Sequence, residues 1–501
     1  MGYCAGAWRD LSLPTYRTMN LACWGNYPVQ PCRVARPERV RDLAPLIEQA
    51  RKAREALSAI GAGEPGSPAT LVARGLGRSY GDASLNEGQG VVVSERLNRF
   101  LAFDPESAVL ECEAGVTIGD IITHMLPRGF FPPVSPGTKF ITIGGGIAVD
   151  VHGKNHHSDG SIAQFTESFQ LLTAEGRLLS CSRTEHPEIF WATLGGMGLT
   201  GIIISARIRL RPVESSYFTV DTKRARDLDS AMELFAGELG ARRFTVAWID
   251  CLASGKKLGR SVLMCGDHAA LSDLPADLRA DPARTRPVEG RSFPCNAPGW
   301  LLSPPTLRAM NIAYYAMHGE GRSVQTYDQF FYPLDGVLHW NRAYGKRGLQ
   351  QYQVVLPPES SRAALLKLLE RLSATGRASF LAVLKTMGPE SGGLLSFPHQ
   401  GWTLALDIPN SPGLDAFLRE LDRITLDHGG RRYLAKDACL AAPDFKQMYP
   451  RAEEFCALRA KLDPEGVFAS SLGRRLGLCE ADTSPGPGAG PGAGAVAGGR
   501  P

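Results

Sequence analysis

The stretch that decides the fold of this 501-residue chain is Pro136–Asp150, PGTKFITIGGGIAVD, which continues into VHGKNHH at residues 151–157. Its three consecutive glycines stand between apolar residues, and glycine loses more conformational freedom on folding than any other residue. Such a cost is kept where another group approaches the backbone so closely that side chains are excluded. A flat ring system or a phosphate group would make that approach.

A second glycine-rich segment, ARGLGRSYGD at residues 73–82, follows a short strand-like run. Its glycines have the spacing G-x-G-x-x-x-G, one residue off the Rossmann fingerprint, and no strong helical pattern follows them. The amides of such a loop can converge on a pyrophosphate, although the segment could also be a tight surface turn. We therefore predict loops at 74–82 and 137–152 that wrap a ligand.

A third cluster, GGMGLTG at residues 195–201, does contain G-x-G-x-x-G. It follows a helix-like segment and precedes a strand, which reverses the strand–loop–helix order that a dinucleotide fingerprint requires. We predict no Rossmann domain.

Three histidines, His152, His156 and His157, raise the question of a metal site. Gly153 interrupts any helix that would bring two of them together, and no carboxylate or cysteine completes a ligand set, so we predict no metal. Each histidine could instead be a satisfied core or loop residue. The eleven cysteines are odd in number and contain no C-x-x-C pair, which favours a reducing compartment over a disulfide framework.

Composition sets further limits on the class of protein. A net charge of +4 is too small to indicate a nucleic-acid partner. No apolar run reaches the roughly 18 residues of a spanning helix, and the N-terminus lacks the apolar core of a signal peptide. These features predict a soluble cytoplasmic protein that is at most peripheral at a membrane.

Hydrophobic periodicity predicts two α+β domains. Before residue 217, a helix is expected within 37–60, another at 117–126 and a strand at 201–212. Beyond it, glycine becomes rarer and four strand-like segments (FTVAWID, QYQVVL, FLAVLKTM and WTLALDIP) alternate with helices at 228–239, 360–374 and 412–428. Residues 1–21 are predicted to be an irregular extension, and the Gly/Pro/Ala-rich residues 478–501 a disordered tail.

With WNRAYG, QYQ and RRYLAKD added to the glycine clusters, the chain resembles the FAD-binding oxidases of the vanillyl-alcohol-oxidase superfamily over roughly residues 22–477. The resemblance implies an α+β, two-domain fold. An FAD-binding domain of the PCMH type would comprise 22–216 and the C-terminal return 431–477, and 217–430 would form an antiparallel-sheet substrate domain.

The resemblance also implies a cofactor site. FAD should be bound non-covalently, because relatives with covalent FAD often have a histidine where this chain has Arg78. The matching cofactor positions are Arg74, Gly75, Gly77, Arg78, Ser79, Tyr80, Gly137, Thr142, Ile143, Gly144, Gly145, Val149, Asp150, Val151, His152, Ile204 and Tyr433.

By the same resemblance, His152 and Lys436 lie beside the reacting centre. The matching substrate-pocket positions are Tyr80, Trp248, Gln351, Gln353, Lys385 and Thr403. The chain departs from the family pattern at three pocket positions. Ala405 replaces a cysteine, Thr403 an asparagine and Phe331 a tyrosine, so the shape of the pocket differs.

Within the superfamily, the chain is similar to the oxidases that convert the 2′-hydroxyl of a polyprenylphosphoryl-β-D-ribose into a 2′-keto sugar, the first half of epimerisation to the arabinose donor of cell-wall arabinan. This implies a polyprenyl-phosphate sugar as substrate and a separate NADH-dependent keto-sugar reductase as partner. An aldonolactone- or alditol-type sugar oxidase that uses molecular oxygen is the alternative enzyme, and a non-enzymatic flavoprotein is a second alternative.

Alcohol oxidation requires a base as well as a hydride acceptor. The ordinary pKa of a histidine lies near neutrality, which makes His152 a candidate, and Lys436 becomes one if burial lowers its pKa. Lys436 could otherwise hold the substrate or form a salt bridge with a structural carboxylate.

Overall fold

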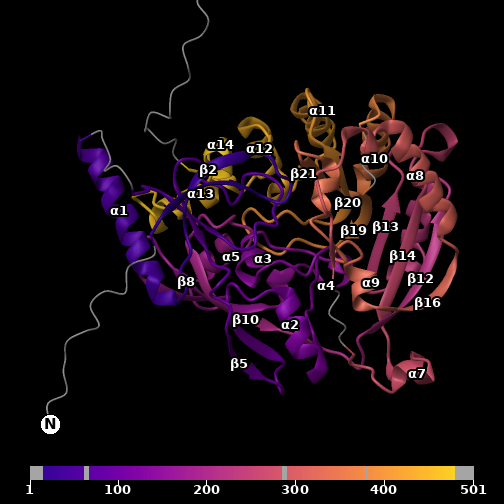
Figure 1. Ribbon diagram of the computed structural model, residues 1–501, viewed down its shortest axis with the longest axis horizontal. Coiled ribbons are helices and arrows are strands. Elements are labelled where there is room, and N and C mark those ends of the chain that lie inside the picture. Colours follow the sequence, from indigo (N-terminus) through magenta and orange to yellow (C-terminus); the bar gives the residue numbers. More distant parts are fainter. Residues whose placement is uncertain (1–14, 61–66, 285–289, 378–380, 480–501) are drawn as a thin grey trace, which may run out of the picture.

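The computed structural model of the chain describes residues 15–60, 67–284, 290–377 and 381–479, and it has an α+β fold of two lobes (Figure 1). The beginning and end of the chain, indigo, purple and yellow in Figure 1, share one lobe. The middle of the chain, pink to orange, forms the other around a large sheet.

The first lobe contains a four-stranded sheet with the order β1-β2-β4-β3, formed by β1 (Arg17–Ala22), β2 (Val29–Ala35), β4 (Gly90–Val93) and β3 (Leu71–Arg74). Helix α1 (Leu43–Ile60), which the spacing of apolar residues predicts, packs on this sheet.

The prediction of an irregular extension over residues 1–21 is wrong for residues 17–21, because they belong to β1. The strand pairs with β2 along its whole length, and its side chains are mostly exposed, so backbone pairing holds it in place rather than an alternating apolar pattern. Residues 1–14 lie outside the described part of the chain.

A five-stranded antiparallel sheet completes the β-structure of the first lobe. Its order is β5 (Phe100–Asp104), β6 (Val109–Glu113), β10 (Ile202–Arg209), β8 (Thr166–Leu172) and β9 (Leu178–Ser182). Helix α2 (Ile118–Met125) is capped by Thr117, whose Oγ1 accepts a hydrogen bond from the Asp120 amide at 3.0 Å. The predicted helix at 117–126 is thus confirmed.

The triple glycine forms a short helix, α3 (Ile143–Ala148), and not the loop that we predicted. Thr142 caps it by accepting a hydrogen bond from the Gly145 amide at 3.2 Å. A Cβ on Gly144 would lie 2.7 Å from the Cβ of Ala114, closer than such atoms pack. Gly144 is therefore required by the close packing of α3 against Ala114.

The second lobe is built on an eight-stranded antiparallel sheet. Its order is β16 (Gly321–Thr326), β12 (Tyr217–Ala225), β14 (Ser261–His268), β13 (Phe244–Ile249), β19 (Ala382–Met387), β20 (Gly401–Pro409), β18 (Leu349–Leu356) and β21 (Arg431–Arg432). Four of these strands, β13, β18, β19 and β20, contain the segments that alternation predicts.

One face of this sheet is covered by helices α6 (Leu228–Ala236), α10 (Pro358–Thr375) and α11 (Leu414–Asp427), all three of which the sequence predicts. Helices α10 and α11 are labelled beside the sheet in Figure 1. Successive side chains of a strand point to opposite faces. On β18, Tyr352 and Val354 pack in the core beneath these helices, so Gln351 and Gln353 point to the other face.

The C-terminal segment returns to the first lobe through α12 (Ala442–Met448), α13 (Ala452–Leu462) and α14 (Ser471–Leu476). The Arg475 guanidinium pairs with the Asp82 carboxylate at 2.7 Å. The prediction that a disordered tail begins at residue 478 is wrong for Leu478 and Cys479, because both are buried against this lobe. Residues 480–501 lie outside the described part of the chain.

Within the described ranges, no helix is long and apolar enough to cross a bilayer.

Candidate active site

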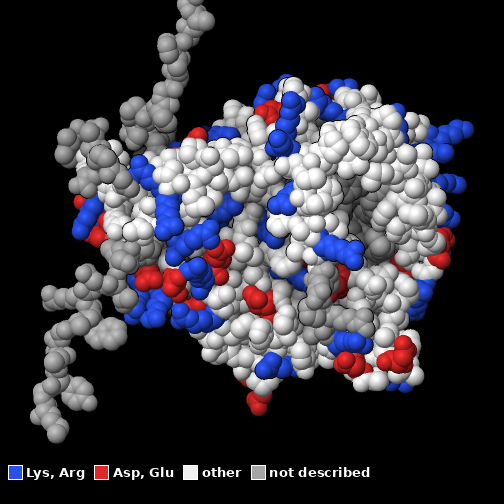
Figure 2. Space-filling model, in the orientation of Figure 1, with Lys and Arg blue, Asp and Glu red and all other residues white. Residues whose placement is uncertain are grey.

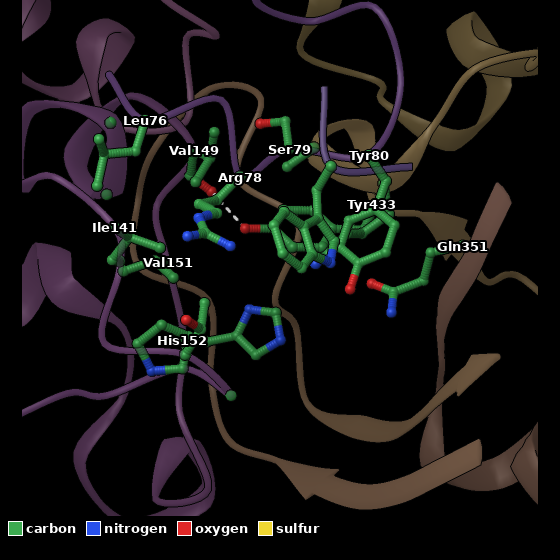
Figure 3. A pocket seen from close by; sticks show the side chains of 18 of the residues that line it. Leu76, Arg78, Ser79, Tyr80, Ile141, Val149, Val151, His152, Gln351 and Tyr433 are labelled. Carbon is green, nitrogen blue, oxygen red and sulfur yellow. Dashed lines mark hydrogen bonds between the residues drawn. The ribbon is translucent and has the colours of Figure 1, made fainter. Parts of the chain in front are cut away.

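A cavity of about 400 Å³ lies between the lobes and is lined by residues of both (Figure 3). The first lobe contributes the 74–80 loop, the end of the 137–142 loop and α3. The second lobe contributes the helix-free face of the large sheet, and the 3-10 helix Leu434–Lys436 closes the wall between them.

Most of the residues that the sequence predicts to form a site line this cavity. They are Arg74, Gly75, Gly77, Arg78, Ser79, Tyr80, Gly137, Thr142, Gly144, Gly145, Val149, Val151, His152, Trp248, Gln351, Gln353, Lys385, Tyr433 and Lys436.

Four predicted residues do not line the cavity. Ile143 and Ile204 are buried in hydrophobic cores, where their side chains pack within the first lobe. Asp150 is fully buried and accepts a hydrogen bond from the Ser391 hydroxyl at 2.7 Å. Thr403 lies behind the wall, where its Oγ1 accepts a hydrogen bond from Gln353 Nε2 at 3.2 Å. The sequence motifs contain these residues, but their side chains point away from the cavity.

The glycine-rich wall presents bare backbone to the cavity. A Cβ on Gly75 would lie 2.2 Å from the Oγ1 of Thr142, so the 74–80 loop lies directly against the cap of α3. Gly77 has φ +63°, a conformation that favours glycine. Gly137, by contrast, has no atom within 4 Å of an added Cβ, so open space borders the backbone there and leaves room for a planar ring or a phosphate of a flavin dinucleotide.

The cavity is strongly cationic. Its charged lining consists of Arg74, Arg78, Lys154, Lys385 and Lys436, and no carboxylate lines it among the described residues. On the outer face in Figure 2, by contrast, basic and acidic side chains are interspersed. The local excess of positive charge suits an anionic ligand such as a phosphate.

His152 projects into the cavity from the segment that follows α3 (Figure 3). Its Nε2 lies 3.1 Å from Gln353 Nε2, and because an amide nitrogen can only donate, this contact places the imidazole proton on Nδ1. Burial, reinforced by the positive charges of Lys385 and Lys436, holds the pKa of His152 well below its usual range. The imidazole is therefore neutral at physiological pH, and its buried Nδ1 has no partner among the described residues.

Lys436 lies at the opposite wall, with its Nζ 4.0 Å from the centre of the Tyr80 ring. The Tyr80 amide donates to the carbonyl of Ala435 at 3.0 Å, which joins the 74–80 loop to the C-terminal segment. Burial lowers the pKa of Lys436, while the carboxylate of Asp407 opposes that shift. Lys436 makes no ion pair within 4.0 Å with a carboxylate of the described chain, so the structural salt bridge considered above is not formed.

Two site residues were missed by the sequence reasoning. Lys154 donates a hydrogen bond to the carbonyl of Phe330, and burial lowers its pKa to about 7. It belongs to the HGKNHH stretch quoted above, which was the available signal. Asp407 accepts a hydrogen bond from Gln351, a contact that depends on the pairing of β18 with β20 and that the sequence alone does not indicate.

Within the described ranges, no group of three His, Cys, Asp or Glu side chains is arranged to hold a metal ion. The cavity thus offers a glycine-lined cradle, cationic side chains, a neutral imidazole and a lysine of lowered pKa. These groups suit proton transfer beside a bound anionic ring cofactor.

Comparison with known proteins identifies the family. Residues 66–182 match the family model "FAD binding domain", and residues 406–476 match "D-arabinono-1,4-lactone oxidase". The chain is 39% identical over 411 residues to decaprenylphosphoryl-β-D-ribose oxidase of Mycolicibacterium smegmatis. The matched region covers 81% of this chain and 89% of that protein.

Two further relatives differ in what their names state. An uncharacterised protein encoded in the mprA 5′ region of Streptomyces coelicolor is 36% identical over 72% of this chain and all of its own length. L-gulonolactone oxidase of Bos taurus is 25% identical over 79% of this chain and 87% of its own length. This chain belongs to the decaprenylphosphoryl-β-D-ribose oxidase family and is an FAD-dependent oxidoreductase.

Proposed function

We propose that the chain oxidises the 2′-hydroxyl of a polyprenylphosphoryl-β-D-ribose to the 2′-keto sugar. The observation that carries this proposal is that His152 and Lys436 face one cationic cavity whose other wall is glycine-lined backbone. The similarity to a protein named for decaprenylphosphoryl-ribose oxidation supports the choice of substrate.

FAD is proposed to bind without a covalent link along the 74–80 loop and α3. Arg78 stands where a linking histidine would be needed, and its guanidinium lies 4.1 Å from the centre of the Trp24 ring. A guanidinium in this place provides positive charge but no nucleophile. The proposed cofactor domain comprises 22–216 and 431–477, and the proposed substrate domain comprises 217–430.

When bound, FAD accepts the hydride from the sugar carbon. The residues of the chain must then take the hydroxyl proton and hold the sugar. Lys436 is the proposed base, because a base works best when its pKa lies near the working pH, and burial lowers the pKa of Lys436 from its high ordinary value. His152, whose pKa lies well below neutrality, is proposed to contact the reacting sugar as a neutral hydrogen-bonding group.

The sugar and its phosphate are proposed to contact the second lobe. Gln351, Gln353 and Trp248 would orient the ribose. Lys385 would pair with the phosphate, because no carboxylate among the described residues of the cavity lining balances its charge. Thr403 is proposed to act indirectly, by holding the amide of Gln353.

Peripheral membrane contact is also proposed, because the substrate class is lipid-linked. Trp300, Ile312 and Met317 are 68%, 56% and 77% exposed. Tyr314, on the same helix α8 (Pro304–Met317) as the latter two, lines the cavity, so this apolar surface adjoins the substrate side. Replacing the three exposed residues by serine should reduce cosedimentation with anionic phospholipid vesicles and leave flavin content unchanged; equal cosedimentation would refute this contact.

The 2′-keto product completes an epimerisation only if a second enzyme reduces it. A separate NADH-dependent keto-sugar reductase is therefore the proposed partner.

The decisive experiment is anaerobic mixing of the yellow protein with a short-chain polyprenylphosphoryl ribose. We expect loss of flavin absorbance with this compound and none with free sugars. The matches to D-arabinono-1,4-lactone oxidase and L-gulonolactone oxidase favour one other function, a sugar or lactone oxidase that reduces oxygen. Flavin reduction by free aldonolactones or alditols, with production of hydrogen peroxide in air, would support that function and overturn ours.

A further inference from the structure

Asp407 lies directly beneath the substrate side of the cavity. It is opposite Gln351 in the register of β18 and β20, and Gln351 Nε2 donates a hydrogen bond to Asp407 Oδ1. Asp407 is fully buried and does not itself line the cavity, whereas Gln351 does. Its carboxylate can therefore act on a ligand only through its neighbours.

The amide of Gln351 has two ends with opposite hydrogen-bonding character. Because its nitrogen donates to Asp407, its carbonyl oxygen is left to face Tyr80 and the cavity (Figure 3). The oxygen can then accept a hydrogen bond from a sugar hydroxyl. An ionised carboxylate can only accept, whereas an asparagine at 407 could turn either its oxygen or its NH2 group toward Gln351 and would no longer impose one orientation.

Ionisable groups on two other elements interact with Asp407: Lys436 of the C-terminal segment and Tyr80 of the glycine-rich loop. Lys385 of β19 and His152, after α3, interact in turn with Lys436. The charge of Asp407 raises the pKa of Lys436, and the charge of Lys385 lowers it. Burial raises the pKa of Asp407 itself to about 7, while the hydrogen bond from Gln351 and the charge of Lys436 oppose that shift, so Asp407 offsets the cationic cluster in its ionised form.

We propose that Asp407 is a positioning residue for the alcohol oxidation proposed above. Asp407 fixes the orientation of the Gln351 amide and influences the charge state of Lys436. This inference rests on the proposed function for its kinetic consequence. The charge of Lys436 can also be measured directly, without substrate.

The chain supplies a matched control on the opposite face of the same strand. Gln350 Nε2 donates to Asp415 Oδ1 at 2.6 Å, so this pair repeats the glutamine–aspartate contact, but neither residue lines the cavity. Asp415→Asn breaks a contact of the same kind while leaving the charges of the cavity unchanged.

The test compares Asp407→Asn with Asp415→Asn and the wild type, all loaded with flavin. The pKa of Lys436 is measured from the pH dependence of its acetylation in competitive labelling, read by peptide mass spectrometry. In Asp407→Asn we expect this pKa to fall by about 1 unit or more, because an opposite charge nearby typically favours the charged form by that amount. Asp415→Asn should leave it unchanged.

The rate of flavin reduction provides the second measurement. A base is active when deprotonated, so the rise of the rate with pH should occur at lower pH in Asp407→Asn. KM for the ribosyl substrate should increase about 2- to 10-fold, the effect of losing one neutral hydrogen bond.

An unchanged labelling pKa of Lys436 in folded, flavin-loaded Asp407→Asn would overturn the proposal. If this variant does not fold, Asp407→Ser is tested in the same way, and failure of both to fold would assign Asp407 to stability alone. If the wild type is not reduced by the ribosyl substrate, the proposed function fails, whereas the labelling result still decides whether Asp407 controls the charge of Lys436.

Discussion

Replacing Lys436 by methionine should separate chemistry from cofactor binding. The side chain keeps most of its length and loses only the ammonium group that lies 4.0 Å from the Tyr80 ring centre. Loss of a general base typically slows a reaction about 10²- to 10⁴-fold. This corresponds to an increase of about 3 to 5.5 kcal/mol in the activation free energy of flavin reduction.

Stability should change far less than rate. Removing the cation–π contact costs about 0.5 to 2 kcal/mol, but burial already disfavours the charged lysine, as its lowered pKa indicates. These two effects oppose each other in the free energy of unfolding. We therefore expect Lys436→Met to fold, to remain yellow and to bind substrate.

The assay is anaerobic stopped-flow measurement of flavin absorbance with a short-chain polyprenylphosphoryl ribose. Lys446→Met is the control, because Lys446 is exposed on α12 and the same charge is removed away from the cavity. Flavin reduction at the wild-type rate in Lys436→Met would refute the role of this residue as base. Loss of bound flavin would instead assign Lys436 to cofactor binding.

Three further predictions concern the fold and the phosphate. A Cβ on Gly81 would lie 1.6 Å from the carbonyl oxygen of Asp437. We therefore expect Gly81→Ala to lower the free energy of unfolding by about 1 to 3 kcal/mol. An unchanged midpoint in a urea titration would contradict this prediction. Arg432 is fully buried, and its guanidinium lies 2.9 Å from the Asp422 carboxylate. Because Arg432→Met leaves buried carboxylates unpaired, it should lower the free energy of unfolding by about 3 to 5 kcal/mol. An unfolding temperature equal to that of the wild type in calorimetry would contradict this prediction. Burial lowers the pKa of Lys385 to about 8, so its positive charge is present below that pH and is lost above it. Affinity for a short polyprenyl phosphate, measured by titration calorimetry, should fall as the pH rises through 8 and should become independent of this step in Lys385→Met.

Four of the eight strands of the second lobe could be predicted because their apolar residues pack against one helix-covered face. β18 illustrates the physical reason: Tyr352 and Val354 must leave water, whereas Gln351 and Gln353 must not be buried without partners. The two glutamines are two residues apart on the strand and therefore share the face opposite the helices.

Helix α8 could not be predicted in this way. Its sequence begins with two prolines, and Met310, Ile312 and Met317 are exposed, so its apolar residues do not form a single buried stripe. Residue Asp407 was missed for a related reason. An acidic residue in a strand is usually solvated, and only the pairing of β20 with β18 reveals its contact with Gln351.

The glycine clusters predicted a close approach to the backbone but not what approaches. At Gly75 and Gly144 the excluded space is occupied by the protein itself, by Thr142 and Ala114. A sequence pattern reports that a side chain is forbidden and does not distinguish a ligand from a neighbouring segment. The helical conformation of α3 follows from its Thr142 cap, which outweighs the poor helix propensity of glycine only once the packing exists.

The ion pair between Asp82 and Arg475 has a consequence for biosynthesis. It joins groups 393 residues apart in the sequence, so the segment after the glycine-rich loop cannot make this contact until α14 has been synthesised. At about 5 to 20 residues per second, the glycine-rich loop waits roughly 20 to 80 s on the ribosome for its partner. Nascent chains halted before α14 should therefore retain little flavin, and stable capture of the cofactor should follow synthesis of α14.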